Sequence, residues 1–299
     1  MKTILMTGAA GGIGTHLRRE LAGKYHLRLS DIRPIKPLAD GESFVRADLT
    51  KLGDLLRATK GVDAVIHLGG HSVEGTWEEI LPANIVGCYN AFEAARRNGV
   101  KRFLFATSNH AVGFYRRDKV IDHRVYIKPD SRYGVAKVFG EALGSLYADK
   151  YDMEVFCMRI GNVNPAPLDK RRLSIWISPR DMAQLVELGL ENPAIEFEIV
   201  YGVSGNARSW YDNENAVRLG YLPQDDSEAF AQDVLAREQP GDARAESYQG
   251  GAFVHTEVIE NPAPLPPARR RAAKKRQAAG TKKKARNATR RPTARAKKK

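Results

Sequence analysis

The stretch TILMTGAAGGIG, residues 3–14, decides the fold. Its apolar half predicts a strand, and its glycines at positions 8, 11, 12 and 14 lead into a helical pattern from Gly12. Glycine permits a sharp turn and lets backbone N–H groups approach a phosphate, which a helix N-terminus also attracts. A glycine-rich loop that only turns the chain is the alternative. The position of these glycines between a strand and a helix favours a dinucleotide-binding turn.

Short apolar runs alternate with longer amphipathic segments along the rest of the chain. The runs predict strands near residues 3–7, 26–30, 43–46, 64–68, 102–107, 154–159 and 196–201. The amphipathic segments predict helices near residues 12–22, 78–98, 132–150 and 180–191. This order predicts an α/β fold with a doubly wound, Rossmann-type parallel sheet. We expect a dinucleotide-binding core over residues 1–161, and the remaining core elements with a small C-terminal substrate lobe over residues 162–261.

Residues 262–299 form a tail rich in Lys, Arg, Ala and Pro, which we predict to be disordered. The net charge of +13 comes from this end of the chain. Residues 269–299 hold 16 of the 48 Lys and Arg residues and no acidic one, which leaves 32 basic against 35 acidic residues elsewhere. Such a tail can contact nucleic acid non-specifically, but it has no aromatic residues to stack on bases. We therefore favour a solubilising tail with incidental polyanion contacts.

Several function classes are disfavoured by composition. No stretch approaches the roughly 18 to 20 apolar residues that cross a bilayer, and the first apolar run is too short for a signal peptide. Cys88 and Cys157 both lie in apolar patterns, so we predict reduced, buried thiols. His67 and His71 straddle a strand end and a Gly-Gly turn without a further ligand, so no metal is assigned. A cytoplasmic protein that does not contact membranes is expected.

The predicted cofactor depends on Asp31, which ends the second strand 17 positions after Gly14. A carboxylate there can accept hydrogen bonds from the adenosine ribose and would repel a 2′-phosphate, so NAD is favoured over NADP. Arg33 keeps the NADP question open, and an Asp that only caps a turn is the alternative. The predicted cofactor-binding residues, several of them chosen by their position after a strand, are Gly8, Gly11, Gly12, Ile13, Gly14, Asp31, Asp48, Leu49, Leu68, Gly69 and Gly70.

The catalytic candidates are Tyr133 and Lys137, together with Ser108 at the end of the fifth strand. Residues four apart share a helix face, so the Lys137 ammonium can favour the phenolate form of Tyr133, a general base. Ser108 can hydrogen-bond the reacting oxygen. A second Tyr-x3-Lys, from Tyr115 to Lys119, lies in a charged, loop-like stretch only seven residues past Ser108 and is discarded.

Together, TGAAGGIG, Asp31, Ser108 and YGVAK resemble the extended short-chain dehydrogenases. The strings HLGGHSVE (67–74), SNHAVGFY (108–115), RRLSIW (171–176) and QGGAFV (249–254) are more specific and are similar to those of uronate dehydrogenases. The resemblance covers nearly all of residues 1–255. It implies NAD-dependent oxidation of the C1 hydroxyl of a hexuronic acid, glucuronate or galacturonate, to an aldarolactone by a homo-oligomer.

The same resemblance implies roles for individual residues. Tyr133 would be the proton acceptor and Lys137 its partner, both also contacting the cofactor, with Asn84 assisting them. A guanidinium suits a carboxylate, so the Arg171 assignment also has a physical basis, although a solvated basic surface is the alternative. Asn162 stands where the family pattern has a serine, which puts the preferred sugar in doubt. The implied substrate-binding residues are Ser72, Ser108, Asn109, His110, Asn162 and Arg171.

Two other functions share some of these features. A nucleotide-sugar epimerase or another extended short-chain dehydrogenase has the same fingerprint and Tyr–Lys pair, but usually a larger C-terminal lobe. A polyanion-binding, NAD-sensing protein would instead use the basic tail. Net NADH production from a free uronate would distinguish a uronate dehydrogenase from an epimerase. Polyanion binding that depends on the tail would indicate the second alternative.

Overall fold

The computed structural model describes residues 1–256, and the predicted disordered tail lies outside them. A parallel sheet of seven strands forms its centre, in the order β3-β2-β1-β4-β5-β6-β9. The strands are β1 (Thr3–Thr7), β2 (His26–Asp31), β3 (Glu42–Arg46), β4 (Ala64–His67), β5 (Arg102–Ser108), β6 (Glu154–Ile160) and β9 (Phe197–Gly202). The chain builds outward from β1 to one edge, then returns to β4 and builds to the other. The predicted doubly wound, Rossmann-type fold is confirmed.

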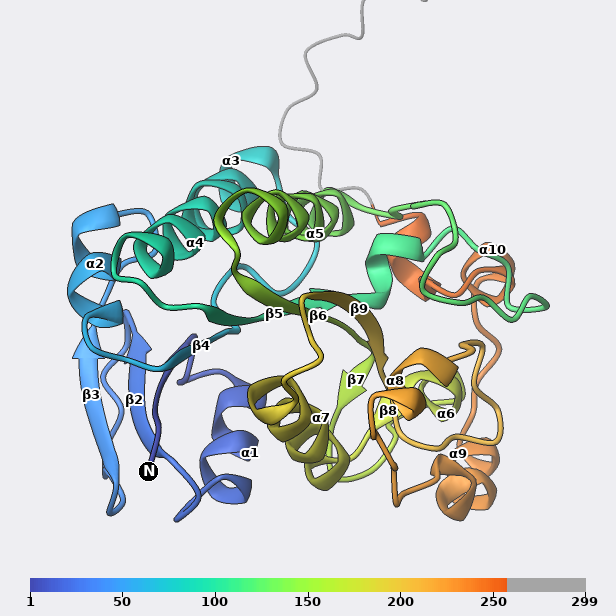
Figure 1. The fold of residues 1–299 in the computed structure, drawn as a ribbon. Helices are drawn as coiled ribbons and strands as arrows, with labels where there is room; N and C mark the ends of the chain where they lie inside the picture. The colour runs from blue at the N-terminus through green and yellow to red at the C-terminus, as the bar shows by residue number, and fades with distance from the viewer. Residues whose placement is uncertain (257–299) are drawn as a thin grey trace, which may run out of the picture. The chain divides into compact units, whose positions relative to one another are not determined.

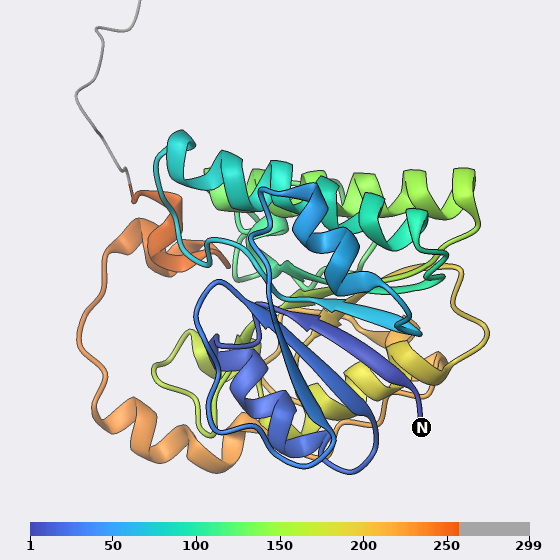
Figure 2. The ribbon, with the colours of Figure 1, turned by 90° about the vertical axis from the view of Figure 1, so that its left-hand side faces the viewer.

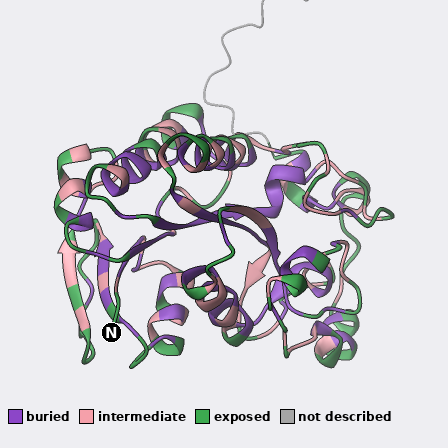
Figure 3. Cartoon of the chain, viewed as in Figure 1, coloured by how far each residue is buried: buried purple, intermediate pink, exposed green. Residues whose placement is uncertain are grey.

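Helices cover both faces of this sheet (Figures 1 and 2). One face carries α1 (Gly12–Glu20) and α7 (Pro179–Glu191), and the other carries α2 (Leu52–Thr59), α4 (Gly87–Arg97) and α5 (Arg132–Tyr151). Alternate residues of a strand point to opposite faces, so Ile4 packs into the core under α1 while Leu5 packs into the core under α4. The central strands are accordingly buried throughout (Figure 3). Cys88 and Cys157 are free, buried members of the second core, as predicted.

The segment predicted as one helix near residues 78–98 is divided into three. A short helix α3 (Trp77–Ile80) begins at a capping box of Thr76 and Glu79, and a π-helical segment η1 (Leu81–Val86) joins it to α4. Pro82 lacks a backbone N–H and cannot make a regular helical hydrogen bond, which fits a local change of winding. Such segments often lie at functional sites.

After β6 the chain forms short elements beside the sheet. A two-stranded sheet of β7 (Asn162–Val163) and β8 (Trp176–Ile177) was not predicted. Of the remaining elements, η2 (Asn109–Val112) lies earlier, between β5 and α5. The others follow β6 and are α6 (Arg172–Ile175), α8 (Glu214–Arg218), η3 (Ser227–Phe230), α9 (Ala231–Ala236), α10 (Ala243–Ser247) and η4 (Gly251–Val254). All described residues belong to one compact unit, and the division at residue 161 stays a prediction. Within the described residues, no helix is long and apolar enough to cross a membrane.

Gly14 allows α1 to approach β1, which leads to a first prediction. A Cβ on Gly14 would lie 2.6 Å from the carbonyl oxygen of Ala9, so the backbone would have to move. We expect Gly14→Ala to lower the free energy of unfolding by about 1–3 kcal/mol. Gly53→Ala in α2 is the control, because no atom lies within 4 Å of its Cβ position, and we expect it to be neutral or mildly stabilising. Urea unfolding without added nucleotide measures both, and equal stabilities of the two variants would contradict the argument.

Candidate active site

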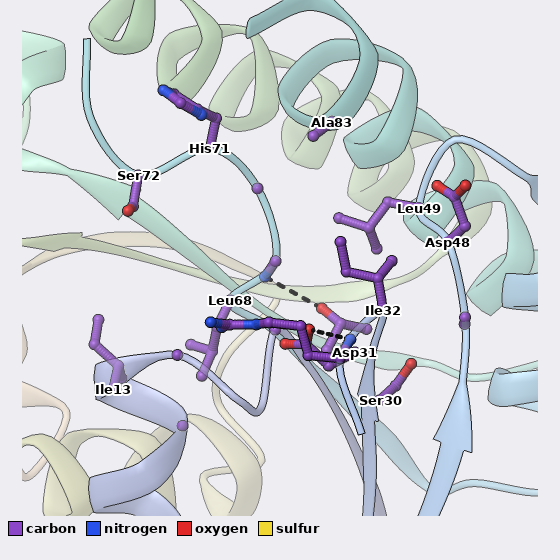
Figure 4. Close-up of a pocket in the computed structure, with 18 of the residues that line it drawn as sticks. Ile13, Ser30, Asp31, Ile32, Asp48, Leu49, Leu68, His71, Ser72 and Ala83 are labelled. Atoms are coloured by element: carbon purple, nitrogen blue, oxygen red, sulfur yellow. Dashed lines mark hydrogen bonds and ion pairs between the residues drawn. The ribbon is translucent and has the colours of Figure 1, made fainter. Parts of the chain in front are cut away.

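A cavity of about 480 Å³ lies at the carboxyl ends of the neighbouring strands β1 and β4, where the strand order reverses (Figure 4). Open α/β sheets bind ligands at this switch point. All of the cofactor residues predicted from the glycine turn and from the three following strand ends line it, together with Thr7, Ser30, Ile32, Arg33, Ala47, Thr50, His71, Ser72, Glu79 and Ala83. Asn84, Tyr133 and Lys137 are not among the residues lining it. Contact of each residue with a cofactor stays a prediction.

The glycine turn leaves room and hydrogen-bond donors for a pyrophosphate. Gly8 has a φ of +67°, and a Cβ there would lie 2.7 Å from the backbone of Gly69. No side chain caps the N-terminus of α1, and its first turn carries no acidic residue. Around Gly12 there is open space. These features fit a dinucleotide whose phosphates approach the first N–H groups of the helix.

Asp31, the last residue of β2, lines this cavity. Its carboxylate accepts hydrogen bonds from the backbone N–H of Ala10, at 3.1 Å, and of Arg33, at 3.0 Å. The largely exposed Arg33 guanidinium donates to the Ala10 carbonyl, 3.1 Å away, and forms an ion pair with the Asp31 carboxylate at 3.6 Å. The backbone thus fixes the Asp31 carboxylate at the cavity wall, and Arg33 offsets part of its charge from the solvent side.

Removing this charge should change the cofactor preference. We expect Asp31→Asn to lower the ratio of kcat/KM with NAD to kcat/KM with NADP by about tenfold or more, because the repulsion of a 2′-phosphate is lost. Asp48→Asn is the matched control in the same cavity, since the carboxylate of Asp48 is already bonded to Thr50. A ratio that is unchanged in Asp31→Asn, or changed equally by both variants, would refute the role of Asp31.

The loop after β4 is anchored on both sides of the cavity. The His67 ring shares a hydrogen bond of 2.7 Å with the Thr7 hydroxyl. Burial lowers the pKa of His67 to about 3. Asn84, in the π-helical segment, holds the backbone of His71 through its oxygen, at 2.6 Å, and its nitrogen, at 2.9 Å. Gly70 allows this approach, since a Cβ there would lie 2.9 Å from the Asn84 side chain. Asn84 thus positions the loop that carries Ser72.

The N-terminus of α5 is fixed by two acceptors. The Ser131 hydroxyl accepts from the Gly134 N–H at 2.9 Å, and the Glu74 carboxylate accepts from the N–H groups of Arg132, at 3.2 Å, and Tyr133, at 3.0 Å. Carboxylates stabilise a helix at this end. Sequence reasoning gave Glu74 no role, because no local pattern relates residue 74 to a helix that begins at residue 132. Glu74 fastens the loop after β4 to the helix that carries Tyr133.

Tyr133 and Lys137 share the buried face of α5, as predicted. The Lys137 Nζ atom lies 5.4 Å from the centre of the Tyr133 ring and donates to the Ala106 carbonyl at 2.7 Å. No carboxylate pairs with Lys137 within residues 1–256. An ammonium next to a phenol favours the phenolate, so the pair can remove a proton from an alcohol.

Ser108 and η2 lie against the start of α5. Gly134 makes this possible, because a Cβ there would lie 2.5 Å from the carbonyl oxygen of His110. The Ser108 hydroxyl caps η2 by accepting from the His110 N–H at 3.2 Å. The His110 ring lies 5.8 Å, centre to centre, from that of Tyr133. The predicted alcohol-oxidising and sugar-contacting groups therefore share one end of the sheet.

Arg171 is a half-buried cation without a carboxylate in ion-pair range within residues 1–256. Its Nε atom donates to the Gln249 carbonyl at 2.8 Å, and its Nη2 atom lies 2.9 Å from the amide oxygen of Asn109 in the orientation that satisfies both ends of that amide. Burial lowers the pKa of Arg171 to about 10, so it stays charged at neutral pH.

Other candidate residues are less closely tied to this group. Asn162, in β7, accepts a hydrogen bond from Asn164 at 2.8 Å, and its contact with a sugar stays a prediction. Ser72 is exposed at the cavity wall (Figure 4). The discarded Tyr115 donates its hydroxyl to the Tyr126 carbonyl at 2.9 Å in a loop, away from a helix face shared with Lys119. Sequence reasoning gave no role to Tyr211, whose hydroxyl is buried beside the Asn109 side chain.

A Rossmann sheet, a glycine turn over a nucleotide-sized cavity and a Tyr–Lys pair define a short-chain type of dehydrogenase. The model of the NAD dependent epimerase/dehydratase family matches residues 4–211, and the chain belongs to this family.

Within the family, the chain is similar to uronate dehydrogenases. That of Pseudomonas putida is 47% identical over 84% of this chain and 94% of its own. The crystal structure of a mutant Agrobacterium tumefaciens uronate dehydrogenase complexed with NAD matches with a TM-score of 0.84 and 38% identity, covering 87% of this chain and 100% of that one. An NAD-dependent glucose-6-phosphate dehydrogenase of Haloferax volcanii is 38% identical over 76% of this chain and 95% of its own.

Proposed function

We propose that this protein oxidises the C1 hydroxyl of a hexuronic acid, glucuronate or galacturonate, to the aldarolactone with NAD. The observation that carries the substrate class is Arg171, a half-buried guanidinium without a carboxylate partner within residues 1–256, whose charge also acts on His110 beside Tyr133. A bound carboxylate would supply the missing counter-charge in a fork geometry that suits Arg. Similarity to uronate dehydrogenases supports the same substrate class.

The residues of the site divide the reaction between them. The glycine turn and Asp31 would hold NAD, which when bound accepts the hydride from C1 of the sugar. Tyr133 takes the proton of the C1 hydroxyl as the C1–H bond breaks, and Lys137 stabilises the phenolate. Ser108 donates a hydrogen bond to the oxygen that becomes the lactone carbonyl. The sugar thus loses one hydride and one proton.

The remaining residues of the site would orient the substrate. Arg171 and Asn109 would bind the carboxylate at C6, and Ser72, His110 and Asn162 would contact ring hydroxyls. With the carboxylate held at one end, C1 is directed toward Tyr133 and the nicotinamide end of the cavity. Holding the reacting atoms in this arrangement supplies much of the rate enhancement.

A substrate screen with the purified protein tests the proposal. NADH formation is followed by its absorbance with glucuronate, galacturonate, glucose and glucose 6-phosphate, each with NAD and with NADP. We expect turnover of a uronate with NAD and a far lower kcat/KM with glucose. No NADH from either uronate, in a folded sample, refutes the proposal. Preferred turnover of glucose 6-phosphate would redirect the anion site to phosphate, and interconversion of a nucleotide sugar without net NADH would favour an epimerase.

Three attributes of the intact protein are also part of this proposal. The redox chemistry on a free sugar acid and the reduced thiols of Cys88 and Cys157 support a cytoplasmic location. A homo-oligomer is inferred from the resemblance, and sedimentation at several concentrations tests it. The basic tail is expected to contribute only non-specific polyanion contacts, which deletion of residues 266–299 should abolish without loss of turnover.

A further inference from the structure

A buried carboxylate lies behind the predicted sugar-binding histidine. The Asp130 Oδ2 atom is 2.7 Å from His110 Nδ1, and its Oδ1 atom accepts a hydrogen bond from the Ser131 hydroxyl at 2.7 Å. The Asp130 backbone N–H also donates to the His110 carbonyl at 3.3 Å. The side chain of Asp130 is completely buried. Asp130 has no place in the reaction derived above, yet it is bonded to one of the residues that face the substrate.

The carboxylate occupies a slot that two glycines make possible. A Cβ on Gly113 would lie 1.8 Å from Asp130 Oδ2, and a Cβ on Gly250 would lie 1.9 Å from the same atom. The two glycines are joined by a hydrogen bond from the Gly250 N–H to the Gly113 carbonyl at 2.9 Å. Any side chain at either position would displace the carboxylate, so the chain on both sides is shaped around it.

The His110 ring is fixed on its other sides as well. It stacks on Phe253 with ring centres 3.9 Å apart and meets Tyr133 edge-on. Within residues 1–256, the ring makes one hydrogen bond, at Nδ1, and none at Nε2. Burial lowers the pKa of His110, although Asp130 opposes this shift. A carboxylate only accepts hydrogen bonds, so the proton of the neutral ring lies on Nδ1 and Nε2 keeps its lone pair.

We propose that Asp130 is a positioning residue that holds His110 in the Nδ1–H tautomer, so that Nε2 accepts a hydrogen bond from a ring hydroxyl of the sugar acid. The proposal rests on the proposed function and deepens it. It assigns the substrate a hydroxyl donor at His110, a second polar contact in addition to the carboxylate that Arg171 binds. Two polar contacts of opposite sense would then orient the sugar.

The tautomer can be measured in the free enzyme. In the full chain labelled with ¹⁵N-histidine, two-bond ¹H–¹⁵N spectra distinguish Nδ1–H from Nε2–H, and His110→Gln identifies the signals of His110 among the seven histidines. We expect Nδ1–H in the unaltered protein. In Asp130→Asn, the oxygen can still accept from Ser131 while the amide donates to Nδ1, which moves the ring proton to Nε2. An Nε2–H or doubly protonated ring in the unaltered protein overturns the proposal, whatever the variant does.

Kinetics then test the contact with the sugar. We expect Asp130→Asn to lower kcat/KM for the uronate by about tenfold or more, because Nε2–H can only donate and the sugar hydroxyl must reverse its hydrogen bond, with KM for NAD unchanged. Unchanged kinetics in a variant whose tautomer has switched overturns the hydrogen bond to the sugar. Asp242→Asn is the matched control, since His255 and Asp242 form an exposed pair at 3.5 Å, and it should alter neither measurement. The spectra need no substrate, so failure of the proposed function can be told apart from failure of this proposal. If the ring is Nδ1–H but no uronate is turned over, only the proposed uronate activity is refuted.

Discussion

Tyr133→Phe is expected to lower kcat for the uronate by about 10²- to 10⁴-fold, the usual contribution of a general base. The substitution removes only the hydroxyl, while the ring keeps its packing against Ile80 and Ala136. The fold and the binding of NAD should therefore be retained. Thermal unfolding and NAD titration, measured beside the steady-state rates, establish that the loss is chemical.

The chain supplies its own control for this experiment. Tyr115 begins the second Tyr-x3-Lys, and its hydroxyl contacts only the Tyr126 carbonyl. Tyr115→Phe should leave kcat within about twofold of the unaltered value, because no general base is removed. A Tyr133→Phe protein with more than a tenth of the original kcat would exclude Tyr133 as the base, and a large loss in Tyr115→Phe would mean that the discarded copy was wrongly excluded.

Features that depend on neighbours in the sequence were predicted well. Strand β1 has the predicted bounds, Thr3–Thr7, because an apolar run ended by glycine has few other ways to bury itself. The Tyr–Lys pair was placed on a shared helix face by its spacing alone. The break in the helix at η1 was missed, although Pro82 was a local signal for it.

Features that depend on distant segments could not be predicted in this way. The slot for Asp130 joins residues 113, 130 and 250, which no periodic pattern relates. Arg171 stands between Lys170 and Arg172, and that local composition suggests solvent. Its burial comes from the other end of the described chain, where Gly251 leaves room for the Arg171 side chain: a Cβ there would lie 2.6 Å from it. Composition describes a neighbourhood in sequence, whereas burial is decided by the fold.

The burial of Arg171 leads to the second large expected effect. Arg171→Met keeps an apolar stem for the buried position and removes the guanidinium. A hydrogen bond to a charged group contributes about 1.5–3 kcal/mol, so we expect kcat/KM for glucuronate to fall about 10- to 150-fold. The loss should be mainly in KM, because the carboxylate at C6 is distant from the bond that breaks and is bound alike in the ground and transition states.

Comparison with glucose separates charge recognition from general damage. Glucose differs from glucuronate at C6, where it carries a hydroxyl in place of the carboxylate oxygens. If Arg171 binds that carboxylate, Arg171→Met lowers kcat/KM for glucuronate and leaves that for glucose nearly unchanged, so the preference between the two sugars falls about tenfold or more. Lys170→Ala removes a neighbouring exposed charge and should leave the preference intact. Equal losses of kcat/KM with both sugars would show that Arg171 supports the fold of the site and does not bind the carboxylate.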